Sequence, residues 1–386
     1  MNARQKIKVV HIITMLEMGG AQGNTLFTVT HLDRNRFDVG LIAGPGGILD
    51  EQASSIKDIH LNFVPALGRP VHPIKDFLAF VALTKILRKE KPDIVHTHSS
   101  KAGILGRMAA QAAGVPKVIH SIHGFGFNPY QKFPVRWLYI FLEKLMARFS
   151  NVLIAVSEQN IATGLRFGIG SEKLYTLIRS GVDVQKIRTA VNGTDAGVLR
   201  EELKVPSEAK VVLCAGPFKL QKDPVAFVEC AAKVARKVPN VRFLWSGDGE
   251  LRPQVEDKVR ELRLENVIKL LGWRNDIPAL LKACDIFILT SLWEGLPRAG
   301  VEALIAGKPV VAFSVDGVPE IVKDGRNGFV LPPGHHAEFA ERVIQLLEDQ
   351  ELYSRFSEEA ARTIDSSFDI HYMVRQQEEL YERLAT

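Results

Sequence analysis

The sequence lacks the features that mark metal-binding, secreted and membrane-spanning proteins. Only three residues are cysteine, and Cys214, Cys230 and Cys284 have no metal-ligand spacing, so we expect buried, reduced thiols. The longest apolar segments, such as 77–87, are too short and too often interrupted to cross a bilayer. No small-residue cleavage site follows the first apolar run, so a signal peptide is not expected. These absences predict a cytoplasmic protein.

Low-complexity sequence is also missing, and the charge is unevenly divided. At 386 residues, 46% of them hydrophobic, the chain is larger than one core usually allows, which predicts two folded domains. Residues 1–185 carry 22 Lys and Arg against 13 Asp and Glu, a net charge of +9, whereas the remainder carries −4. The basic half indicates an anionic partner, either nucleic acid, a lipid headgroup surface or a phosphorylated substrate. Nucleic acid fits worst, because no recognised nucleic-acid motif accompanies the charge.

Strand-like and helix-like segments alternate in both halves, which predicts parallel sheets covered by helices on both faces. We expect two doubly wound α/β domains, 1–187 and 188–368, and a final amphipathic helix, 369–386, that crosses back to the first domain. Strands are expected at 8–14, 38–43, 93–96, 117–121, 152–156, 210–215, 241–246, 267–270, 283–290, 309–313 and 328–331. Helices are expected at 24–31, 74–89, 101–113, 132–148, 157–167, 225–237, 255–262, 277–282 and 297–306.

The most informative stretch runs from Glu294 to Glu302. Glu294 follows a buried strand, Pro297 stands where proline begins helices, and Glu302 lies on that helix. A helix start favours an anion, and the flanking carboxylates can accept hydrogen bonds from hydroxyl groups. Phosphate beside sugar and ribose hydroxyls is what a nucleotide-sugar presents, so this stretch predicts a nucleotide-sugar site.

Other candidates follow strands at the same sheet edges. Lys222 lies in a loop after strand 210–215, where it can neutralise a phosphate, and Lys219 is a weaker second candidate. Gly19 and Gly20 follow the first strand, where glycine lets a backbone approach a ligand, and Gly247 lies in a further turn. A solvated lysine and ordinary turns are the alternatives, and a dinucleotide-binding Gly-x-Gly-x-x-Gly fingerprint is absent.

Three histidines lie at strand ends of the first half. His96 and His98 point to the same side of one strand, but no carboxylate or cysteine accompanies them, so a polar rim is expected rather than a metal site. His123 follows strand 117–121 in a Gly-rich loop and is expected to face the crevice, with a structural role as the alternative. The basic, aromatic helix 132–148 fits either a membrane interface or a packed helix with a basic outer stripe.

Taken in order, these motifs resemble the family 4 glycosyltransferases, which have the GT-B architecture of two facing Rossmann-like domains with a cleft between them. The resemblance spans nearly the whole chain, and its most specific part is Glu294-Gly-Leu-Pro-x4-Glu302, followed by 307–311 and 317–320. It departs from the family at Pro217, which stands where an arginine usually shares the diphosphate, and at Gln22 and Ser180.

The resemblance implies a role for each candidate. Glu294 is expected to contact the transferred sugar, with His123 beside it, and Glu302 to contact the ribose. Lys222 is expected to hold the diphosphate, helped by the backbone of Gly19 and Gly20. Lys219 is the candidate to replace the arginine absent at position 217, and Gly247 is a candidate nucleotide contact. His96 and His98 fall on the acceptor side.

The resemblance further implies a retaining hexosyltransferase of cell-surface polysaccharide biosynthesis. The expected donor is a nucleoside-diphosphate sugar, most simply a UDP-sugar, and the acceptor a saccharide or lipid-linked saccharide. The leaving phosphate takes the acceptor proton, and neither metal nor cofactor is needed. The basic domain is expected to contact the anionic inner face of the cell membrane, without nucleic acid as a partner. The alternatives are a sugar-nucleotide epimerase or hydrolase, and a non-catalytic sugar-nucleotide-binding module, which Pro217 favours.

Overall fold

The protein, represented by a computed structural model that describes residues 6–386, divides into two compact units. Unit 1 combines the chain up to Gly181 with Ile370–Thr386, and unit 2 is Val182–Asp369. The sequence-based boundary at 187/188 falls inside helix α7 (Val184–Gly193), so the segment interpreted as a junction is helical. Residues 1–5 of the expected first domain lie outside the described residues.

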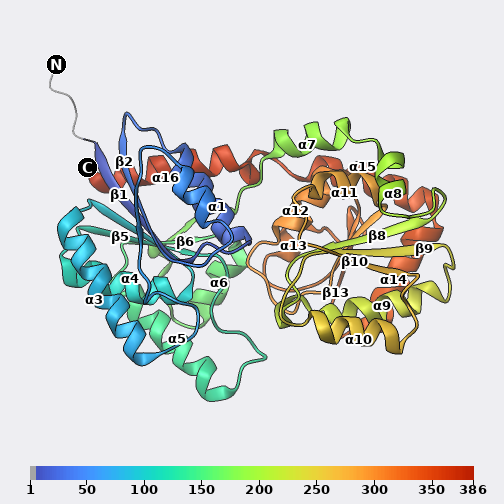
Figure 1. The fold of residues 1–386 in the computed structure, drawn as a ribbon, viewed down its shortest axis with the longest axis horizontal. Coiled ribbons are helices and arrows are strands. Elements are labelled where there is room, and N and C mark those ends of the chain that lie inside the picture. Colours follow the sequence, from blue (N-terminus) through green and yellow to red (C-terminus); the bar gives the residue numbers. More distant parts are fainter. Residues whose placement is uncertain (1–5) are drawn as a thin grey trace. The chain divides into compact units, whose positions relative to one another are not determined.

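Unit 1 is built on a seven-stranded sheet in which every strand pair is parallel. The spatial order is β3-β2-β1-β4-β5-β6-β7 (Figure 1). Strands β2 and β3 follow on one side of β1 and strands β4 to β7 on the other, so the strand order reverses between β1 and β4. The strands are β1 (Ile7–Met15), β2 (Phe37–Gly44), β3 (His60–Phe63), β4 (Ile94–His98), β5 (Lys117–Ile122), β6 (Val152–Ala155) and β7 (Tyr175–Leu177).

Alternate side chains of β1 pack into two separate cores. Val9 and Ile13 face a cluster that includes residues of α1 and α16, whereas Val10 and Ile12 face a cluster with residues of α3 and α4. His11, between Val10 and Ile12, therefore faces the α16 side. The helices of unit 1 are α1 (Gly20–His31), α2 (Asp50–Ser55), α3 (Pro73–Glu90), α4 (Ser100–Ala113), α5 (Phe133–Ala147), α6 (Glu158–Arg166) and α16 (Ile370–Ala385).

Unit 2 repeats the same order with six parallel strands, β10-β9-β8-β11-β12-β13. The reversal here lies between β8 and β11. Its strands are β8 (Lys210–Ala215), β9 (Val241–Ser246), β10 (Ile268–Gly272), β11 (Ile286–Leu289), β12 (Val310–Phe313) and β13 (Gly328–Leu331). Besides α7, its helices are α8 (Ala196–Glu202), α9 (Pro224–Ala235), α10 (Arg252–Glu261), α11 (Ile277–Ala283), α12 (Arg298–Ile305), α13 (Val318–Ile321), α14 (His336–Glu348) and α15 (Gln350–Thr363).

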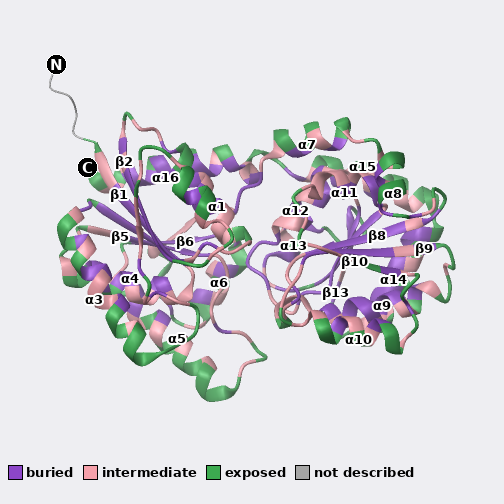
Figure 2. Cartoon of the chain, viewed as in Figure 1, coloured by how far each residue is buried: buried purple, intermediate pink, exposed green. Residues whose placement is uncertain are grey.

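All the expected strands and helices form, and the two strands that the sequence did not predict have weak local patterns. β3 and β7 are short edge strands of four and three residues, without a fully buried residue, so they lack the continuous apolar run of the central strands. Figure 2 shows the central strands of both sheets as buried. The helices α2, α7, α8, α13, α14 and α15 were also not predicted.

Helix α5 is neither fully packed nor simply basic on its outer side. Ile140 and Met146 are buried against unit 1, whereas Phe133 and Phe141 are 73% and 59% exposed. The expectation of a packed helix with a basic outer stripe is therefore only partly correct, because the outer side of α5 also carries large apolar residues.

The expectation of buried thiols holds in the part of the chain that the structure describes. The three cysteines of unit 2 are free and buried, and burial raises the pKa of each thiol to about 12. Among residues 6–386, none of the helices combines the length and the apolar character needed to cross a bilayer.

Candidate functional site

The structure brings Lys222 and Glu294 together at the carboxyl edge of the unit 2 sheet. Lys222 ends a short 3₁₀ turn after β8, and Glu294 lies in the loop after β11. Their side chains form an ion pair, and Ser291 Oγ donates to Glu294 Oε1 at 2.6 Å. β8 and β11 are the pair at which the strand order reverses, the point where open α/β sheets bind ligands.

Hydrogen bonds join the loop that carries Lys222 to the loop that carries Glu294. Thr290 Oγ1 donates to the Lys222 carbonyl at 2.7 Å, and Gln221 Nε2 donates to the Trp293 carbonyl at 3.0 Å. The Leu292 amide in turn donates to the Gln221 carbonyl at 2.8 Å. The ammonium and the carboxylate are thus held in place by the backbone of both loops.

Glu294 also depends on a residue that the sequence analysis did not single out. The Glu294 amide donates to Asp316 Oδ2 at 2.7 Å, and Asp316 adopts a left-handed conformation with φ of 40°. Burial, and secondarily the Glu294 charge, raise the pKa of Asp316 to about 6. The one sequence signal is its position directly before Gly317, in a turn that leads to α13.

Glu302 lies on α12, in the helix that follows this loop. Its side chain is 20% exposed, and Arg298 Nη2 lies 4.0 Å from its Oε1. Burial raises the pKa of Glu302, and the Arg298 charge acts in the opposite direction. Glu302 is therefore a partly accessible acceptor for hydroxyl groups, next to a cation.

The remaining unit 2 candidates have different surroundings. Gly247 has φ of 146°, and a Cβ there would come within 1.9 Å of the Gly216 carbonyl oxygen, so glycine is required by close packing. Its amide donates to the Gly272 carbonyl at 2.8 Å, so this N–H is bonded within the protein. Lys219 is partly buried at the start of the 3₁₀ turn, and its carbonyl accepts from the Lys222 amide at 2.9 Å.

In unit 1, Gly19 and Gly20 are exposed at the start of α1. The Gly19 carbonyl accepts the first helical hydrogen bond, from the Gly23 amide, at 3.0 Å. A Cβ on Gly19 would lie 2.5 Å from Gln22 Oε1. The two glycines thus lie at the exposed start of α1, whereas the sequence predicted that this helix begins near Asn24.

His96 is an interior residue, and the expectation of a polar rim is wrong for it. Its side chain is 0% exposed, with Nδ1 2.6 Å from the Tyr381 hydroxyl and Nε2 2.8 Å from Ser121 Oγ. Because both ring nitrogens are bonded within the protein, His96 is not positioned to contact an acceptor. Its hydrogen bonds instead connect β4 to β5 and to α16, beneath the carboxyl edge of the sheet.

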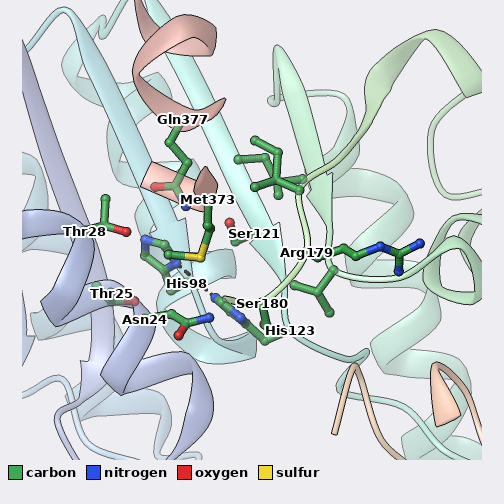
Figure 3. A pocket seen from close by; sticks show the side chains of 13 residues that line it. Asn24, Thr25, Thr28, His98, Ser121, His123, Arg179, Ser180, Met373 and Gln377 are labelled. Carbon is green, nitrogen blue, oxygen red and sulfur yellow. Dashed lines mark hydrogen bonds between the residues drawn. The ribbon is translucent and has the colours of Figure 1, made fainter. Parts of the chain in front are cut away.

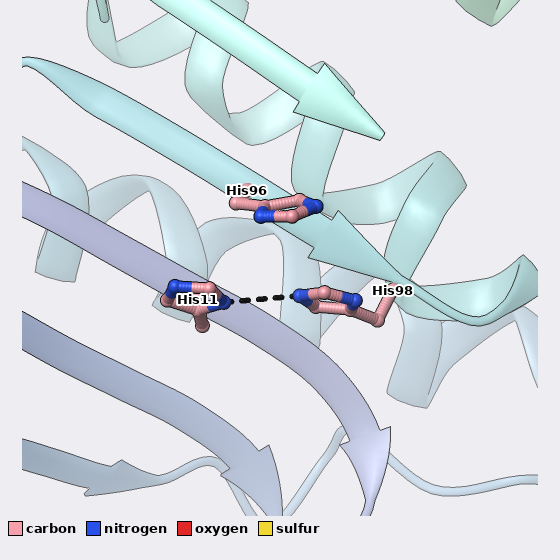
Figure 4. A group of neighbouring side chains, drawn as sticks. All are labelled: His11, His96 and His98. Carbon is pink, nitrogen blue, oxygen red and sulfur yellow. Dashed lines mark hydrogen bonds between the residues drawn. The ribbon is translucent and has the colours of Figure 1, made fainter. Parts of the chain in front are cut away.

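His98 lies between two other histidines. Its Nε2 is 3.0 Å from His11 Nδ1 (Figure 4), and its Nδ1 is 3.2 Å from His123 Nε2 (Figure 3). The Tyr381 hydroxyl lies 3.5 Å from His11 Nε2, so the chain of contacts runs from α16 to His123. His123 is the partly exposed member, within a narrow cavity of about 10 Å³ that Asn24 and Ser180 also line.

The buried members of this network are neutral. Burial, and secondarily Arg34, lower the pKa of His11 to about 3, and burial holds the pKa values of His96 and His98 well below the usual range. A neutral imidazole donates at one nitrogen and accepts at the other. The proton position on His98 is therefore linked to those on His11 and His123.

The ligand nitrogens of His11, His96 and His98 lie within 4.8 Å of one another, so a third histidine joins the pair that the sequence analysis weighed as metal ligands. The short contact between His11 and His98 aligns their facing nitrogens as donor and acceptor, and both His96 nitrogens bond to hydroxyl groups. Geometry thus favours a hydrogen-bonded network over metal coordination.

Comparison with known proteins agrees with this architecture. Residues 18–186 match the family described as "Glycosyltransferase Family 4", and residues 196–363 match "Glycosyl transferases group 1". The fold also matches the crystal structure of Anabaena Alr3699/HepE in complex with UDP-glucose, with a TM-score of 0.83 and 22% identity over 98% of this chain and 100% of that one. A second fold match is WaaG, a glycosyltransferase involved in lipopolysaccharide biosynthesis, with a TM-score of 0.76 and 15% identity over 97% and 99% of the two chains.

The fold and the two matched regions define a GT-B glycosyltransferase. Among its relatives is the Escherichia coli UDP-Gal:alpha-D-GlcNAc-diphosphoundecaprenol alpha-1,3-galactosyltransferase, 34% identical over 98% of both chains. Another is the Campylobacter jejuni N,N'-diacetylbacillosaminyl-diphospho-undecaprenol alpha-1,3-N-acetylgalactosaminyltransferase, 25% identical over 87% of this chain and 89% of the relative. The chain therefore belongs to the family 4 glycosyltransferases of polysaccharide biosynthesis, which confirms the resemblance and the fold class that the sequence predicted.

Proposed function

We propose that this glycosyltransferase moves a hexose from a UDP-sugar to a hydroxyl of a saccharide carried on a polyprenyl diphosphate, with retention at the anomeric carbon and without a metal ion. The observation that carries the proposal is the likeness to the Escherichia coli galactosyltransferase along the full length of both chains. In this proposal unit 2 binds the donor and unit 1 binds the acceptor. The geometry at the unit 2 edge supports the donor assignment.

Lys222 contacts the diphosphate of the donor, and Glu294 contacts its sugar. When the diphosphate binds, the Lys222 ammonium exchanges its carboxylate partner for phosphate oxygens, and Glu294 becomes an acceptor for sugar hydroxyls. Removing one donor of a hydrogen bond to a developing anion typically costs roughly 3–4 kcal/mol of transition-state stabilisation. A positive side chain held in this way provides charge that a metal would otherwise supply.

Glu302 and His123 complete the proposed donor contacts, with the ribose and the transferred sugar respectively, and Gly19 and Gly20 add backbone donors for the diphosphate. Retention follows if the leaving phosphate accepts the proton of the incoming hydroxyl on the face that it leaves. This route requires no covalent intermediate on the protein. It relies on positioning and on charge stabilisation.

Unit 1 brings the enzyme to its acceptor. Its sequence is strongly basic, with a net charge of +9 over residues 1–185, and a polyprenyl-linked acceptor resides in a membrane. We therefore place the protein at the anionic inner face of the cell membrane. Liposome flotation tests this point: binding should increase with the anionic lipid fraction and fall at high salt, and equal binding to neutral vesicles would contradict it.

The decisive experiment incubates UDP-hexoses with GlcNAc-diphosphoundecaprenol, with and without EDTA, and determines the anomeric configuration of the product by NMR. An α-linked product from an α-linked donor, formed at the same rate in EDTA, is the expected result. An inverted product or an EDTA-sensitive rate overturns the corresponding part of the proposal. Turnover of the donor without acceptor indicates the epimerase or hydrolase alternative, and UDP binding without any turnover indicates the binding module.

A further inference from the structure

A second cavity of unit 1 is far larger than the one beside His123. It measures about 490 Å³, within the range of small-molecule sites, and is lined by residues from the end of β1, the start of α4 and the length of α5. Thr14 and Ser99, which mark the ends of β1 and β4, form its polar side and are joined by a 2.7 Å hydrogen bond between their hydroxyls. The cavity therefore begins at the point where the unit 1 strand order reverses.

The opposite wall of this cavity is apolar. Ile104 and Leu105 of α4 line it together with Val135, Leu138 and Leu142 of α5, whose side chains carry no polar atom, and Tyr139 of α5 adds one hydroxyl. Val135 and Leu138 are also 45% and 54% exposed, so the cavity opens onto the surface through them.

Two cations line the cavity together with their carboxylate partners. Lys101 Nζ lies 2.6 Å from Asp76 Oδ1, and Arg69 Nη1 lies 3.0 Å from Glu17 Oε2. Arg69 is 56% exposed and is therefore within reach of a further anionic ligand. The charges of the lining therefore balance, and a diphosphate gains the two cations only by replacing their carboxylate partners.

The surface around the opening is unusually apolar. Nine of the sixteen large hydrophobic residues that are exposed in the described chain lie on α5 or in the segment 71–78 at the start of α3, so they are concentrated on one part of unit 1. Phe77, Trp137 and Phe141 are 64%, 47% and 59% exposed. In Figure 2 the outer turns of α5 are exposed. Patches of this kind mark contact with protein or membrane, and Lys132, Lys144 and Arg148 at the same helix favour an anionic membrane.

We propose that the 490 Å³ cavity binds the first isoprenoid units of a polyprenyl-diphosphate-linked acceptor while the surrounding face of α3 and α5 lies in the membrane interface. This inference rests on the proposed function. The polar end of the cavity lies at the substrate edge of the sheet, where the acceptor saccharide is required. Arg69 and Lys101 meet the diphosphate, and the apolar wall guides the chain toward the exposed face and the bilayer.

The cavity connects the substrate edge of the sheet with the apolar face of α3 and α5. A polyprenyl-diphosphate-linked acceptor uses both parts, and other occupants do not. An acyl chain of a bulk membrane lipid needs only the apolar wall, and would make no use of Thr14, Ser99 or the two cations. A second copy of the protein would have to cover a face rich in positive charge with a face of the same kind, which like charges disfavour.

The test uses farnesyl diphosphate with a diazirine on its last isoprene unit, photolysed with the full-length protein and mapped by peptide mass spectrometry. We expect labelling of α4 and α5 that falls at least about tenfold in Leu138→Glu and in Val135→Glu, because a carboxylate in the apolar wall excludes the chain. Leu165→Glu on α6, which changes an exposed leucine outside the cavity, is the matched control and should label as the wild type does. Circular dichroism confirms that each variant is folded, and UDP binding is measured in parallel by calorimetry.

The outcomes distinguish failure of the isoprenoid site from failure of the donor assignment. UDP binding without labelling of α4 and α5 overturns the isoprenoid site and leaves the proposed function standing. Labelling without UDP binding overturns the donor assignment and supports the apolar-chain site. Equal labelling by a diazirine fatty acid identifies bulk lipid as the occupant, and labelling unaffected by either glutamate variant identifies adsorption to the surface; both overturn the proposal.

Discussion

The two units have the same strand order around the point of reversal, but one carries charged and the other neutral side chains near the carboxyl edge of its sheet. In unit 2 the reversal point carries an ammonium and a carboxylate, Lys222 and Glu294, held by the loops after β8 and β11. In unit 1 the residues below the equivalent edge are neutral imidazoles and hydroxyls, and both ring nitrogens of His96 and of His98 lie within hydrogen-bond distance of other side chains. An edge with fixed charge suits a diphosphate, whereas the buried, paired histidines of unit 1 support their edge without contacting a ligand.

The largest effect is expected at the charged edge. Lys222→Ala removes the cation proposed to stabilise the leaving diphosphate, so kcat/KM should fall by about 10²–10³. Steady-state assays with the lipid-linked acceptor measure this. Lys219→Ala should lose much less, because Lys219 is only the weaker candidate for the missing arginine at position 217.

Since Lys222→Ala also leaves the buried Glu294 carboxylate without its partner, folding must be checked in the same preparation. Lys222→Arg restores the charge and should recover part of the activity. A folded Lys222→Ala enzyme with unchanged kcat/KM would remove Lys222 from the site.

The contrast between charged and neutral edges also predicts that unit 1 unfolds first in acid. The pKa values of His11, His96 and His98 are lowered in the folded state, so the unfolded chain binds more protons as the pH falls below about 6.5. Each such histidine removes about 1.4 kcal/mol of stability per pH unit below that value, and this contribution is constant above it.

Asp316 of unit 2 acts in the opposite sense. Burial raises the pKa of Asp316 to about 6, so its folded state favours the protonated acid and gains stability as the pH falls from about 6 toward the ordinary value of 3.8. No histidine among the described residues of unit 2 is buried. Hydrogen exchange of both units between pH 7 and 4.5 tests the order of unfolding, and earlier loss of protection in unit 2 would contradict it.

A moderate effect is expected at the end of the histidine network. Tyr381→Phe removes the hydroxyl that bonds His96 at 2.6 Å and leaves a buried ring nitrogen unpaired, which costs about 1–3 kcal/mol. Urea unfolding followed by a unit 1 probe measures the loss. UDP binding to unit 2 should be unchanged, and a loss of stability confined to unit 2 would show that the two edges are not independent.

The sequence predicted the charged edge better than the neutral one, for a physical reason. Lys222 and Glu294 each follow a continuous apolar strand, and in a parallel sheet all such positions reach the same edge. His11 was not recognised as a neighbour of His96 because their contact depends on the pairing of β1 with β4. Tyr381 is 285 residues from His96, and no local pattern relates the two.

Asp316 was missed for a different reason, because it acts through the backbone of its neighbour. Its carboxylate accepts from the Glu294 amide, a role that depends on an approach of two loops rather than on residue type or spacing. Likewise, the basic, aromatic sequence of helix 132–148 left a membrane interface and a packed helix as alternatives and gave no sign of the cavity that it lines, since that cavity requires α4 and the segment around Arg69.

The smallest effect is expected for Asp316→Asn, which separates the hydrogen bond of Asp316 from its charge. Asparagine keeps an oxygen acceptor for the Glu294 amide and tolerates the left-handed φ of 40°. It removes a carboxylate whose ionisation burial opposes, so the free energy of unfolding at pH 7 should stay the same or rise by less than about 1 kcal/mol. Asp316→Ala, which loses the acceptor, should instead destabilise unit 2 by about 1–3 kcal/mol.

Denaturation of the two variants at pH 7 and pH 5 measures this difference. The advantage of asparagine over aspartate should shrink at pH 5, because the wild-type carboxyl is then largely protonated and no longer suffers the penalty of a buried charge. If Asp316→Asn were as damaging as Asp316→Ala at pH 7 but not at pH 5, the ionised carboxylate itself would be required at this edge. Asp316 would then add a third charged group to the ion pair of Lys222 and Glu294, and the contrast between a charged and a neutral edge would be stronger than the ion pair alone indicates.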